Sequence, residues 1–437
     1  MFWIEFSYIS TSMQSYAQAL TYAIPAFLAL IGLEALVSWK MGIKINRGPD
    51  MISSLTSGIS NIVKDVLGLS IAIVSYAWLV DHIALFDIGT QWYVFVIAFI
   101  AKDFAGYWIH RMEHTINVFW NRHIIHHSSE EFNLSCALRQ SISEVFSFVG
   151  LFLLPAAVIG VPVEVIAIIA PIQLFAQFWY HTRLINKMGV MEYIIVTPSH
   201  HRVHHAINPE YIDRNYGQIF IIWDKLFGTF QPELKEVPPV YGVKRPVHTW
   251  NPLLIGIQHI WLILKDAIRA QSWKDKIKIW FMPTGWRPDD VKQKHPLEVV
   301  EDVYHLNKYD THLSASMLSW SWIQLWVLLA FTMDLFLRFG AIGFPGVMVY
   351  GLYLFVSIFS ITSLMDKVSY APLAEAGRFI LVLFILISSQ WDWFGISTVF
   401  NPAVNFVFSF AVLSLVVAFY FHLSENRYYN RGGVLAR

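Results

Sequence analysis

Charged residues are scarce in this chain. Asp, Glu, Lys and Arg make up 14% of its 437 residues, whereas hydrophobic residues make up 56%. Soluble domains carry roughly a quarter charged residues, so this balance excludes an ordinary soluble protein. The 31 basic and 31 acidic side chains cancel, so the chain also lacks the excess positive charge that typifies nucleic-acid-binding proteins.

Cysteine is almost absent as well. The one cysteine, Cys136, excludes an intrachain disulfide framework and a cluster held by several thiolates. The first residues contain no basic stretch ahead of a short apolar run. The sequence therefore predicts no cleavable signal peptide.

Long apolar runs are abundant, and nine of them are candidates for membrane-spanning helices. They are residues 20–39, 65–86, 91–110, 144–159, 163–179, 316–336, 342–363, 379–390 and 403–421. With the amino terminus outside, nearly all Lys and Arg residues fall on the cytosolic side, Arg338 being the exception. The sequence therefore predicts an all-α integral membrane protein of about nine transmembrane helices, with its carboxyl terminus in the cytosol.

The same pattern suggests four regions. They are N-terminal membrane helices (1–100), a catalytic core (101–235), a cytosolic or interfacial segment (236–314) and C-terminal membrane helices (315–437). Within the third region, residues 253–268 have apolar side chains at helical spacing. That stretch is either a packed helix or a helix lying in the membrane interface.

Histidine has the most informative spacing. Ten of the 17 histidines lie between His110 and His205, in the runs HRMEH (110–114), HIIHH (123–127) and HHRVHH (200–205). Offsets of three and four residues place side chains on one face of a helix. The predicted topology brings the three runs, and His181, to the cytosolic side. The chain should therefore carry a cytosolic, histidine-rich metal centre.

The number of histidines predicts two metal ions. One tetrahedral zinc takes about four ligands, and two haems with paired histidines would also need only four. A metal-transport path would spread its ligands through the bilayer. Imidazole suits both iron and zinc, and iron is the choice for oxygen chemistry. The predicted ligands are His110, His114, His123, His126, His127, His181, His201, His204 and His205.

The sequence assigns roles less strongly to other side chains near these histidine runs. His200 is left out because His201 completes the repeated spacing. The carboxylates that could orient imidazoles are Glu130, Glu131 and Glu144, and the candidates for contacting polar substrate groups are Asn133 and Gln140. Loop capping is expected of Asp213, Arg214 and Asn215. Aromatic candidates for a lipid tunnel are Trp108, Trp120, Phe178, Trp179 and Tyr180.

The pattern HxxxH, HxxHH, HxxHH resembles that of the fatty acid hydroxylase/sterol desaturase superfamily of membrane di-iron enzymes. Members use O2 and two irons to hydroxylate or desaturate lipids. The surrounding sequence is similar to that of alkylglycerol monooxygenases, in HHSSEEFNLSCALRQS (126–141) and in TPSHHRVHHAINPEYIDRNYGQIFIIWDKLFGTFQPE (197–233).

The resemblance implies an O2-dependent di-iron monooxygenase that hydroxylates the ether-linked carbon of alkylglycerols, giving an aldehyde and a glycerol derivative. It implies tetrahydrobiopterin as reductant. Alkylglycerol monooxygenases are expected to have a glutamate after the second histidine, where Thr115 stands here. A redox protein therefore remains an alternative electron donor. Desaturation or hydroxylation of a sterol, sphingolipid or fatty acid remains an alternative reaction. The implied membrane is the endoplasmic reticulum in a eukaryote or the inner membrane in a bacterium, with the site facing the cytosol.

Overall fold

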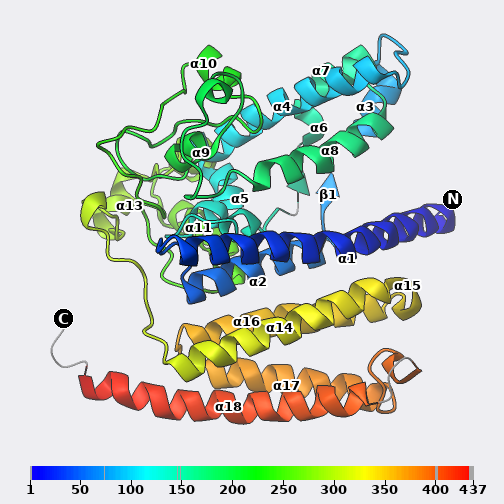
Figure 1. Cartoon of the computed structure of the whole chain (residues 1–437), viewed down its shortest axis with the longest axis vertical. Coiled ribbons are helices and arrows are strands. Elements are labelled where there is room, and N and C mark those ends of the chain that lie inside the picture. Colours follow the sequence, from blue (N-terminus) through cyan, green and yellow to red (C-terminus); the bar gives the residue numbers. More distant parts are fainter. Residues whose placement is uncertain (1, 73, 145, 148, 399–401, 433–437) are drawn as a thin grey trace.

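A computed structural model describes residues 2–72, 74–144, 146–147, 149–398 and 402–432. Nearly all regular structure in these ranges is helical (Figure 1). The exceptions are isolated bridges and a parallel pairing of two residues each, between β1 (Ile71–Ala72) and β2 (Phe146–Ser147). The predicted all-α class is therefore confirmed.

Six helices in the described ranges are long and apolar enough to cross a membrane. They are α1 (Phe2–Lys40), α4 (Trp92–Thr115), α14 (Ala315–Leu337), α16 (Gly346–Met365), α17 (Ala371–Ser388) and α18 (Ala403–Gly432). The chain is thus a multi-pass membrane protein. Helix α17 begins eight residues before the expected segment 379–390, because Pro372 initiates its first turn.

The prediction of a membrane-spanning helix at residues 65–86 is wrong. Helix α2 (Gly48–Val66) ends at the start of this segment, and Gly68 then departs from the helical path with a φ of +66°. That left-handed conformation is readily available only to glycine. Helix α3 (Tyr76–Ile83) is eight residues long, which is far short of a bilayer.

The two expected spans at 144–159 and 163–179 also do not form membrane-length helices. The first is divided into α6 (Val149–Phe152) and α7 (Leu154–Ile159), with a proline in the first turn of α7. Proline cannot donate the backbone hydrogen bond that would continue the preceding helix. The second, α8 (Val163–Phe178), is continuous but has 16 residues. In the described ranges, six membrane-length helices therefore replace the nine that hydrophobicity alone suggests.

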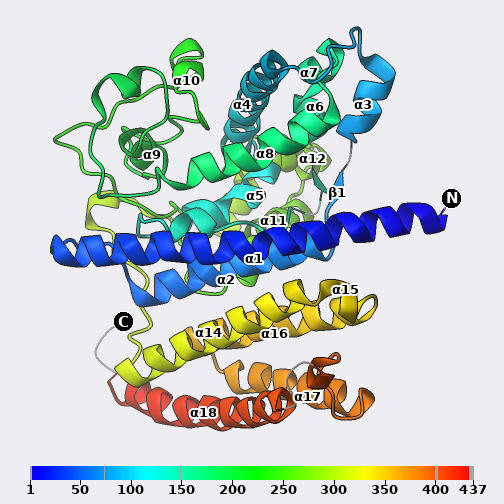
Figure 2. The same cartoon turned by 45° about the vertical axis from the view of Figure 1, so that its right-hand side comes forward.

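The helices form layers that run side by side in both views (Figures 1 and 2). Helices α1 and α2 occupy the middle, with α14, α16, α17 and α18 on one side. Helices α4 and α8 lie on the other side, together with the short α3, α6 and α7. At one end of the layers lie α9 (Pro198–His204), α10 (Ile222–Leu226) and α13 (Asp289–Lys294), whereas α5 (Asn117–His127) and α11 (Pro252–Arg269) lie between α1 and α8 in both views.

The remaining short elements connect these layers. They are α12 (Trp273–Phe281), α15 (Phe339–Ile342), and the 3-10 turns η1 (Cys136–Leu138), η2 (Gly189–Tyr193), η3 (Val303–His305) and η4 (Ile396–Thr398). The amphipathic stretch 253–268 is part of α11, which buries Ile255 and Ile263 and leaves Ile257 and Trp261 exposed. This helix packs on α5 and still presents an apolar outer face.

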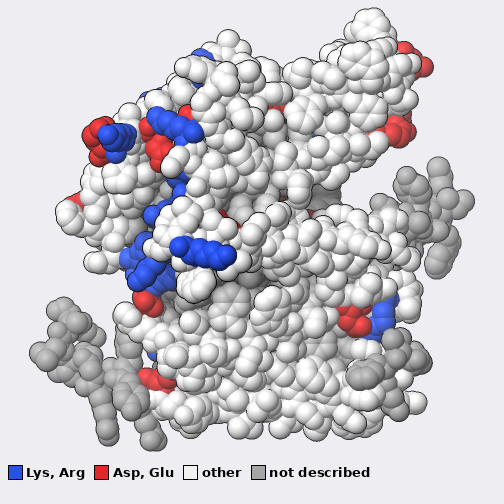
Figure 3. All heavy atoms as spheres, in the orientation of Figure 1, with Lys and Arg blue, Asp and Glu red and all other residues white. Residues whose placement is uncertain are grey.

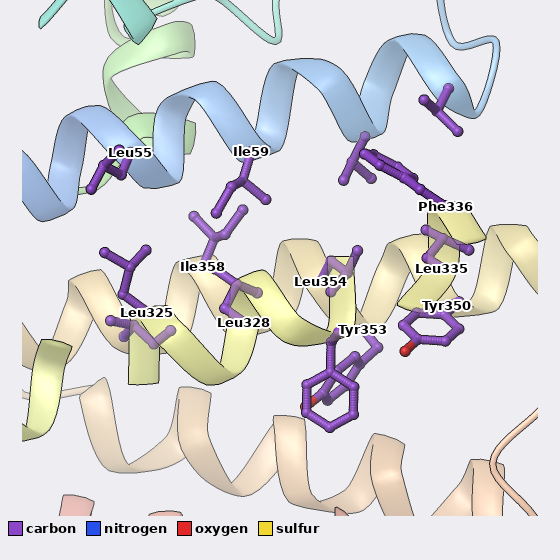
Figure 4. Packing of buried hydrophobic residues seen from close by; sticks show 14 of the residues in the cluster. Leu55, Ile59, Leu325, Leu328, Leu335, Phe336, Tyr350, Tyr353, Leu354 and Ile358 are labelled. Atoms are coloured by element: carbon purple, nitrogen blue, oxygen red, sulfur yellow. The ribbon is translucent and has the colours of Figure 1, made fainter. Parts of the chain in front are cut away.

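The largest apolar core lies between α2 and the carboxyl-terminal helices. Leu55 and Ile59 of α2 point toward α14 and α16, where Leu328 and Ile358 meet them (Figure 4). This contact fixes α2 beside the membrane helices. It also fixes the segment after α5, because η1 packs on α2.

Charge is distributed unevenly over the molecule. On the face that Figure 3 shows, the visible Lys and Arg side chains gather mainly toward the end that holds α9 and α13, and the rest of this face is largely uncharged. An uncharged flank suits contact with lipid hydrocarbon, and a charged end suits water and headgroups.

Candidate metal centre

One group of histidines comes from α4, α5 and α9. His110 and His114 lie one turn apart at the end of α4, His123 and His127 lie one turn apart on α5, and His204 ends α9. One ring nitrogen from each lies within 4.8 Å of the others. The Nε2 atom of His123 is 3.0 Å from that of His110 and 3.1 Å from that of His127.

A second group contains His126, His181, His201 and His205, again with ring nitrogens within 4.8 Å of one another. The Nε2 atom of His201 is 2.8 Å from that of His181 and 3.0 Å from that of His205. The two groups adjoin, since the rings of His127 and His205 stack with centroids 4.3 Å apart. The structure therefore brings all nine proposed ligands together.

Each HxxHH run divides between the two groups, which its spacing alone does not indicate. The pair at positions one and five enters one group, and the residue at position four enters the other. Thus His123 and His127 join the first group and His126 the second, whereas His201 and His205 join the second group and His204 the first. The short helices α5 and α9 thus each contribute to both groups, which His110 and His114 of α4 and His181 complete.

His200 belongs to neither group. It is buried at the start of α9, where its Nδ1 accepts the backbone N–H of Thr197 at 3.4 Å, and it lies near Glu192. A histidine in this role satisfies a backbone donor of the first helical turn.

Backbone carbonyls orient several of the clustered rings. His126 Nδ1 donates to the carbonyl of Arg139 at 3.2 Å, and His181 Nδ1 donates to that of Gln177 at 2.9 Å. His110 and His204 have the same kind of contact with residues 216 and 214, at 2.8 and 3.0 Å. Such contacts fix the ring tautomer and direct the opposite nitrogen.

This arrangement fits a cation. His126 and His181 both donate from Nδ1, so each neutral ring presents a lone pair at Nε2, and these two atoms face each other at 3.3 Å. Two lone pairs at that separation repel unless a Lewis acid lies between them. Nitrogen–metal bonds of roughly 2.1 Å place neighbouring ligand atoms roughly 3 Å apart. The Nε2 atoms of His114 and His204 are buried without a hydrogen-bond partner, as metal ligands would be.

Burial keeps the imidazoles outside α4 neutral. Desolvation lowers the pKa of His126 to about 3, and it lowers the pKa of His127, His181 and His205 well below the usual value, with the neighbouring histidines adding to the effect. A neutral imidazole is the form that binds a metal ion.

The carboxylates beside the histidines are not the three that the sequence suggests. Glu130 accepts a backbone N–H from Tyr309, and Glu131 and Glu144 pair with Lys308 and Arg122. None of these three carboxylates contacts a ring in the described part of the chain. These three glutamates are close to the histidines in the sequence, but the chain after α5 turns their carboxylates away from the histidine rings.

Glu113 and Asp213 approach the rings instead. Glu113 Oε2 lies 3.5 Å from His123 Nδ1, and Asp213 Oδ1 lies 3.8 Å from His114 Nδ1. The signal for Glu113 is its position three residues after His110 on α4, which puts both on neighbouring faces. Asp213 has a φ of +57°, and no local pattern predicts that it folds back onto α4.

A buried ion pair supports His126. The Arg139 guanidinium donates to Asp50 of α2 at 2.9 Å, to Ser54 at 2.9 Å and to Ser128 at 2.8 Å. Both charged residues are 2% exposed. The carbonyl of Arg139 is the acceptor for His126, so the pair ties α2 to a clustered histidine.

The contacts of Asn133 and Asn215 differ from those that the sequence predicts. Asn133 is fully buried, donates to the carbonyl of Ile45 at 2.7 Å and accepts from the backbone of Ser135, so it holds a loop rather than contacting a substrate. Asn215, expected to cap a loop, donates to the carbonyls of His200 and Gln231. It therefore anchors α9 to the loops that follow.

A cavity of about 510 Å³ leads from the membrane helices to the histidines. Its walls come from α1, α2, α4, α8 and α14, and include Leu20, Phe27, Ile59, Leu174, Phe178, Leu325 and Leu329. Five clustered histidines line its inner end, at positions 110, 123, 126, 181 and 201. Of the aromatic candidates for a lipid tunnel, Phe178 and Tyr180 line this cavity. Charged residues also line it, among them Lys102, Glu113 and Arg122, and its larger apolar part suits a lipid chain.

Comparison with known proteins agrees with this arrangement. Residues 95–229 match the fatty acid hydroxylase family model. The chain is 32% identical to alkylglycerol monooxygenase of Homo sapiens, over 86% of this chain and 84% of that protein. It is 33% identical to alkylglycerol monooxygenase of Xenopus tropicalis, over 82% and 80%. A Delta(7)-sterol 5(6)-desaturase of Gibberella zeae is 24% identical over 36% of this chain and 49% of its own length. No solved structure shows significant similarity.

The fold and the two histidine groups define a membrane oxidoreductase of the fatty acid hydroxylase type, a class whose histidine clusters indicate metal binding. Within that class, this chain belongs to the alkylglycerol monooxygenase family.

Proposed function

We propose that this protein is a di-iron monooxygenase that hydroxylates the ether-linked carbon of alkylglycerols. The observation that carries this proposal is the match, over more than 80% of this chain, to relatives named alkylglycerol monooxygenase, in a chain whose lipid-sized cavity ends at two groups of histidines. The ligands would be the nine histidines of the two groups, from the proposed catalytic core 101–235.

The reaction consumes one O2 and two electrons. One oxygen atom enters the C–H bond beside the ether oxygen, and the other leaves as water with two protons. The resulting hemiacetal breaks into a fatty aldehyde and a glycerol derivative. The bound irons would supply the activation of O2, which side chains cannot provide.

The protein's own residues would hold the substrate and exclude water. Apolar walls from α1, α8 and α14 would take the alkyl chain, with the ether carbon at the histidine end. Gln140, Gln177 and Gln218 line the same cavity and would meet the glycerol hydroxyls. Gly106 of α4 allows this approach, because an added Cβ would lie 2.0 Å from the Gln218 side-chain oxygen.

We propose tetrahydrobiopterin as the source of electrons. Thr115, which departs from the expected glutamate, is exposed at the end of α4, and its hydroxyl donates to the carbonyl of Arg111 at 2.8 Å. A side chain here lies outside both histidine groups. Glu113, one turn from His110, supplies a carboxylate on the inner side of the same helix end. The proposal therefore does not rely on a carboxylate at position 115.

The charged end that carries the histidines would face the cytosol. This orientation follows from the concentration of basic residues at that end, as in other multi-pass proteins. The membrane would be the endoplasmic reticulum in a eukaryote or the inner membrane in a bacterium.

Product analysis tests the function directly. Membranes containing the protein would receive O2, tetrahydrobiopterin and a labelled alkylglycerol, beside His126→Ala membranes. We expect labelled aldehyde from the first and none from the second, by mass spectrometry. Oxidation of a sterol, sphingolipid or fatty acid without aldehyde release would assign the related desaturase or hydroxylase activity instead. Absence of bound iron would overturn the monooxygenase proposal.

Filling the membrane cavity should change the preferred chain length. Ala23 lines the cavity on α1, whereas Ala26 lies exposed on the same helix outside it. We expect Ala23→Trp to lower turnover of an octadecyl ether by roughly 10- to 100-fold. The indole would exclude several methylenes from the cavity, and each buried methylene contributes about 0.8 kcal/mol. A decyl ether should be affected much less. Ala26→Trp should leave both rates near those of the unaltered protein, and equal loss for both ethers would contradict the cavity assignment.

A further inference from the structure

A second cavity, of about 580 Å³, lies against the histidines. Its walls come from α5, from the loops at 242–245, 284–287 and 296–299, and from the inner face of α11. Four clustered histidines line it: His114, His127, His204 and His205.

The two cavities share no lining residue among the described parts of the chain. The nine clustered histidines divide between them, five on the membrane cavity and four on the second. Each histidine group contributes to both cavities, since His114 and His110 belong to one group and His205 and His201 to the other. The clustered histidines therefore line two separate spaces that both reach the proposed metal positions.

Charged residues line both cavities, but the cations of the first, Lys102 and Arg122, are engaged by Gln173 and Glu144. The second cavity differs in this respect. Lys244 and Arg245 line it, and no hydrogen bond or ion pair engages either side chain in the described structure. Asp213 places a carboxylate beside His114, and the Thr284 hydroxyl is buried there without a partner. Asp266 is already paired with Arg287 at 2.5 Å, which leaves the free cations in excess.

Flat apolar surfaces complete the site. The Trp120 ring lies 5.2 Å from that of His114 and 5.7 Å from that of His127, between centroids. Trp286 and Ile263 also line the cavity. Free donors, one carboxylate and aromatic walls complement a planar heterocycle that carries both carbonyl acceptors and N–H donors.

We propose that this second cavity binds a small, planar, two-electron reductant, which therefore reaches the histidines through a space separate from the lipid cavity. The inference rests on the proposed function, in which RH, O2 and a reduced donor DH2 give ROH, water and D. The donor loses two electrons and two protons, and these convert the second oxygen atom to water. A cavity of this volume holds one drug-sized molecule, and it leaves no room for the bulk of a redox protein around its own prosthetic group.

Cysteine labelling tests occupancy without turnover. The natural Cys136 is fully buried, so an introduced thiol would report its own surroundings. Lys292 lines the cavity and is exposed, whereas Lys294 is exposed outside it. Under argon, tetrahydrobiopterin should slow maleimide labelling of Lys292→Cys at least roughly 5-fold when the site is mostly filled, and should not slow labelling of Lys294→Cys. Reduced flavin mononucleotide would be the second probe. Failure of both probes to protect Lys292→Cys would overturn the proposal.

Kinetics give an independent test. Lys244→Gln and Arg245→Gln should each raise the KM for the reductant, by roughly 10- to 100-fold for a lost charge-assisted hydrogen bond, and leave the KM for the lipid unchanged. Lys235→Gln, an exposed position outside the cavity, should change neither. If the lipid KM rises instead, the second cavity is a lipid site and the proposal fails.

The outcomes separate this proposal from the proposed function. Aldehyde release with an unaltered reductant KM in both cavity variants would keep the function and overturn the reductant site. Protection of Lys292→Cys without aldehyde release would keep the reductant site and reject the alkylglycerol substrate.

Discussion

Replacing His181 with alanine should remove one of the two metal ions and nearly all activity. His181 Nε2 lies between His126 and His201, at 3.3 and 2.8 Å, so its loss leaves three histidines in the second group. We expect bound iron to fall from about two ions per chain to about one. Aldehyde formation should fall by at least roughly 1,000-fold, because a metal ion contributes several kcal/mol to such chemistry.

Metal analysis of purified protein measures this effect, with product formation on the same sample. The matched control is His295→Ala, since His295 is an exposed histidine outside both groups. The control should retain both ions. If His181→Ala also keeps two ions and normal turnover, His181 is not a ligand.

Replacing Asp50 with alanine should destabilise the protein by about 3–5 kcal/mol. The substitution leaves the Arg139 guanidinium buried without its counter-ion, and removing one partner of a buried pair costs this much. It also releases Ser129, whose hydroxyl donates to Asp50 at 2.7 Å. Because the Arg139 carbonyl orients His126, metal in the second group should be lost before the helices unfold.

Unfolding in detergent, followed together with iron release, would reveal the expected order of events. In the control, Asp289→Ala removes an exposed partner of Lys292 and should change stability little, as is usual for surface pairs. The double variant Asp50→Ala/Arg139→Met removes both charges and should recover much of the lost stability. If the Asp50→Ala protein is as stable as the unaltered one, the prediction is wrong, and water or another group compensates the buried charge of Arg139.

Sequence periodicity predicts the positions of the histidines well. Offsets of three and four residues put His123, His126 and His127 on one side of a short helix, and α5 has that form. The division of each run between two groups depends on how α5 and α9 face each other. That is a tertiary property, since these helices lie about 70 residues apart in the chain.

Hydrophobicity predicts membrane helices less well where short apolar helices pack together. Residues 144–159 are apolar enough for a span, yet α6 and α7 fold as a pair beside α3, and the Leu85 N–H donates to the carbonyl of Val158. Likewise, Asp50 and Arg139 are 89 residues apart, so local pattern contains no sign of their pairing. Neighbours in the sequence predicted Glu130 and Glu144, whereas the folded chain presents Glu113 and Asp213.

The shortness of α8 has a consequence for the surrounding bilayer. Its 16 residues, at a rise of about 1.5 Å each, extend about 24 Å, whereas the hydrocarbon core of a bilayer is about 30 Å thick. This helix is too short to cross a bilayer of full thickness, and hydrophobic mismatch beside such a helix favours a thinner bilayer. Leu174 and Phe178 of α8 line the membrane cavity, so we expect the bilayer to be thin beside this wall. Bilayer thickness, set by acyl-chain length and sterol content, thereby becomes a determinant of how readily a lipid leaves the membrane for the histidines.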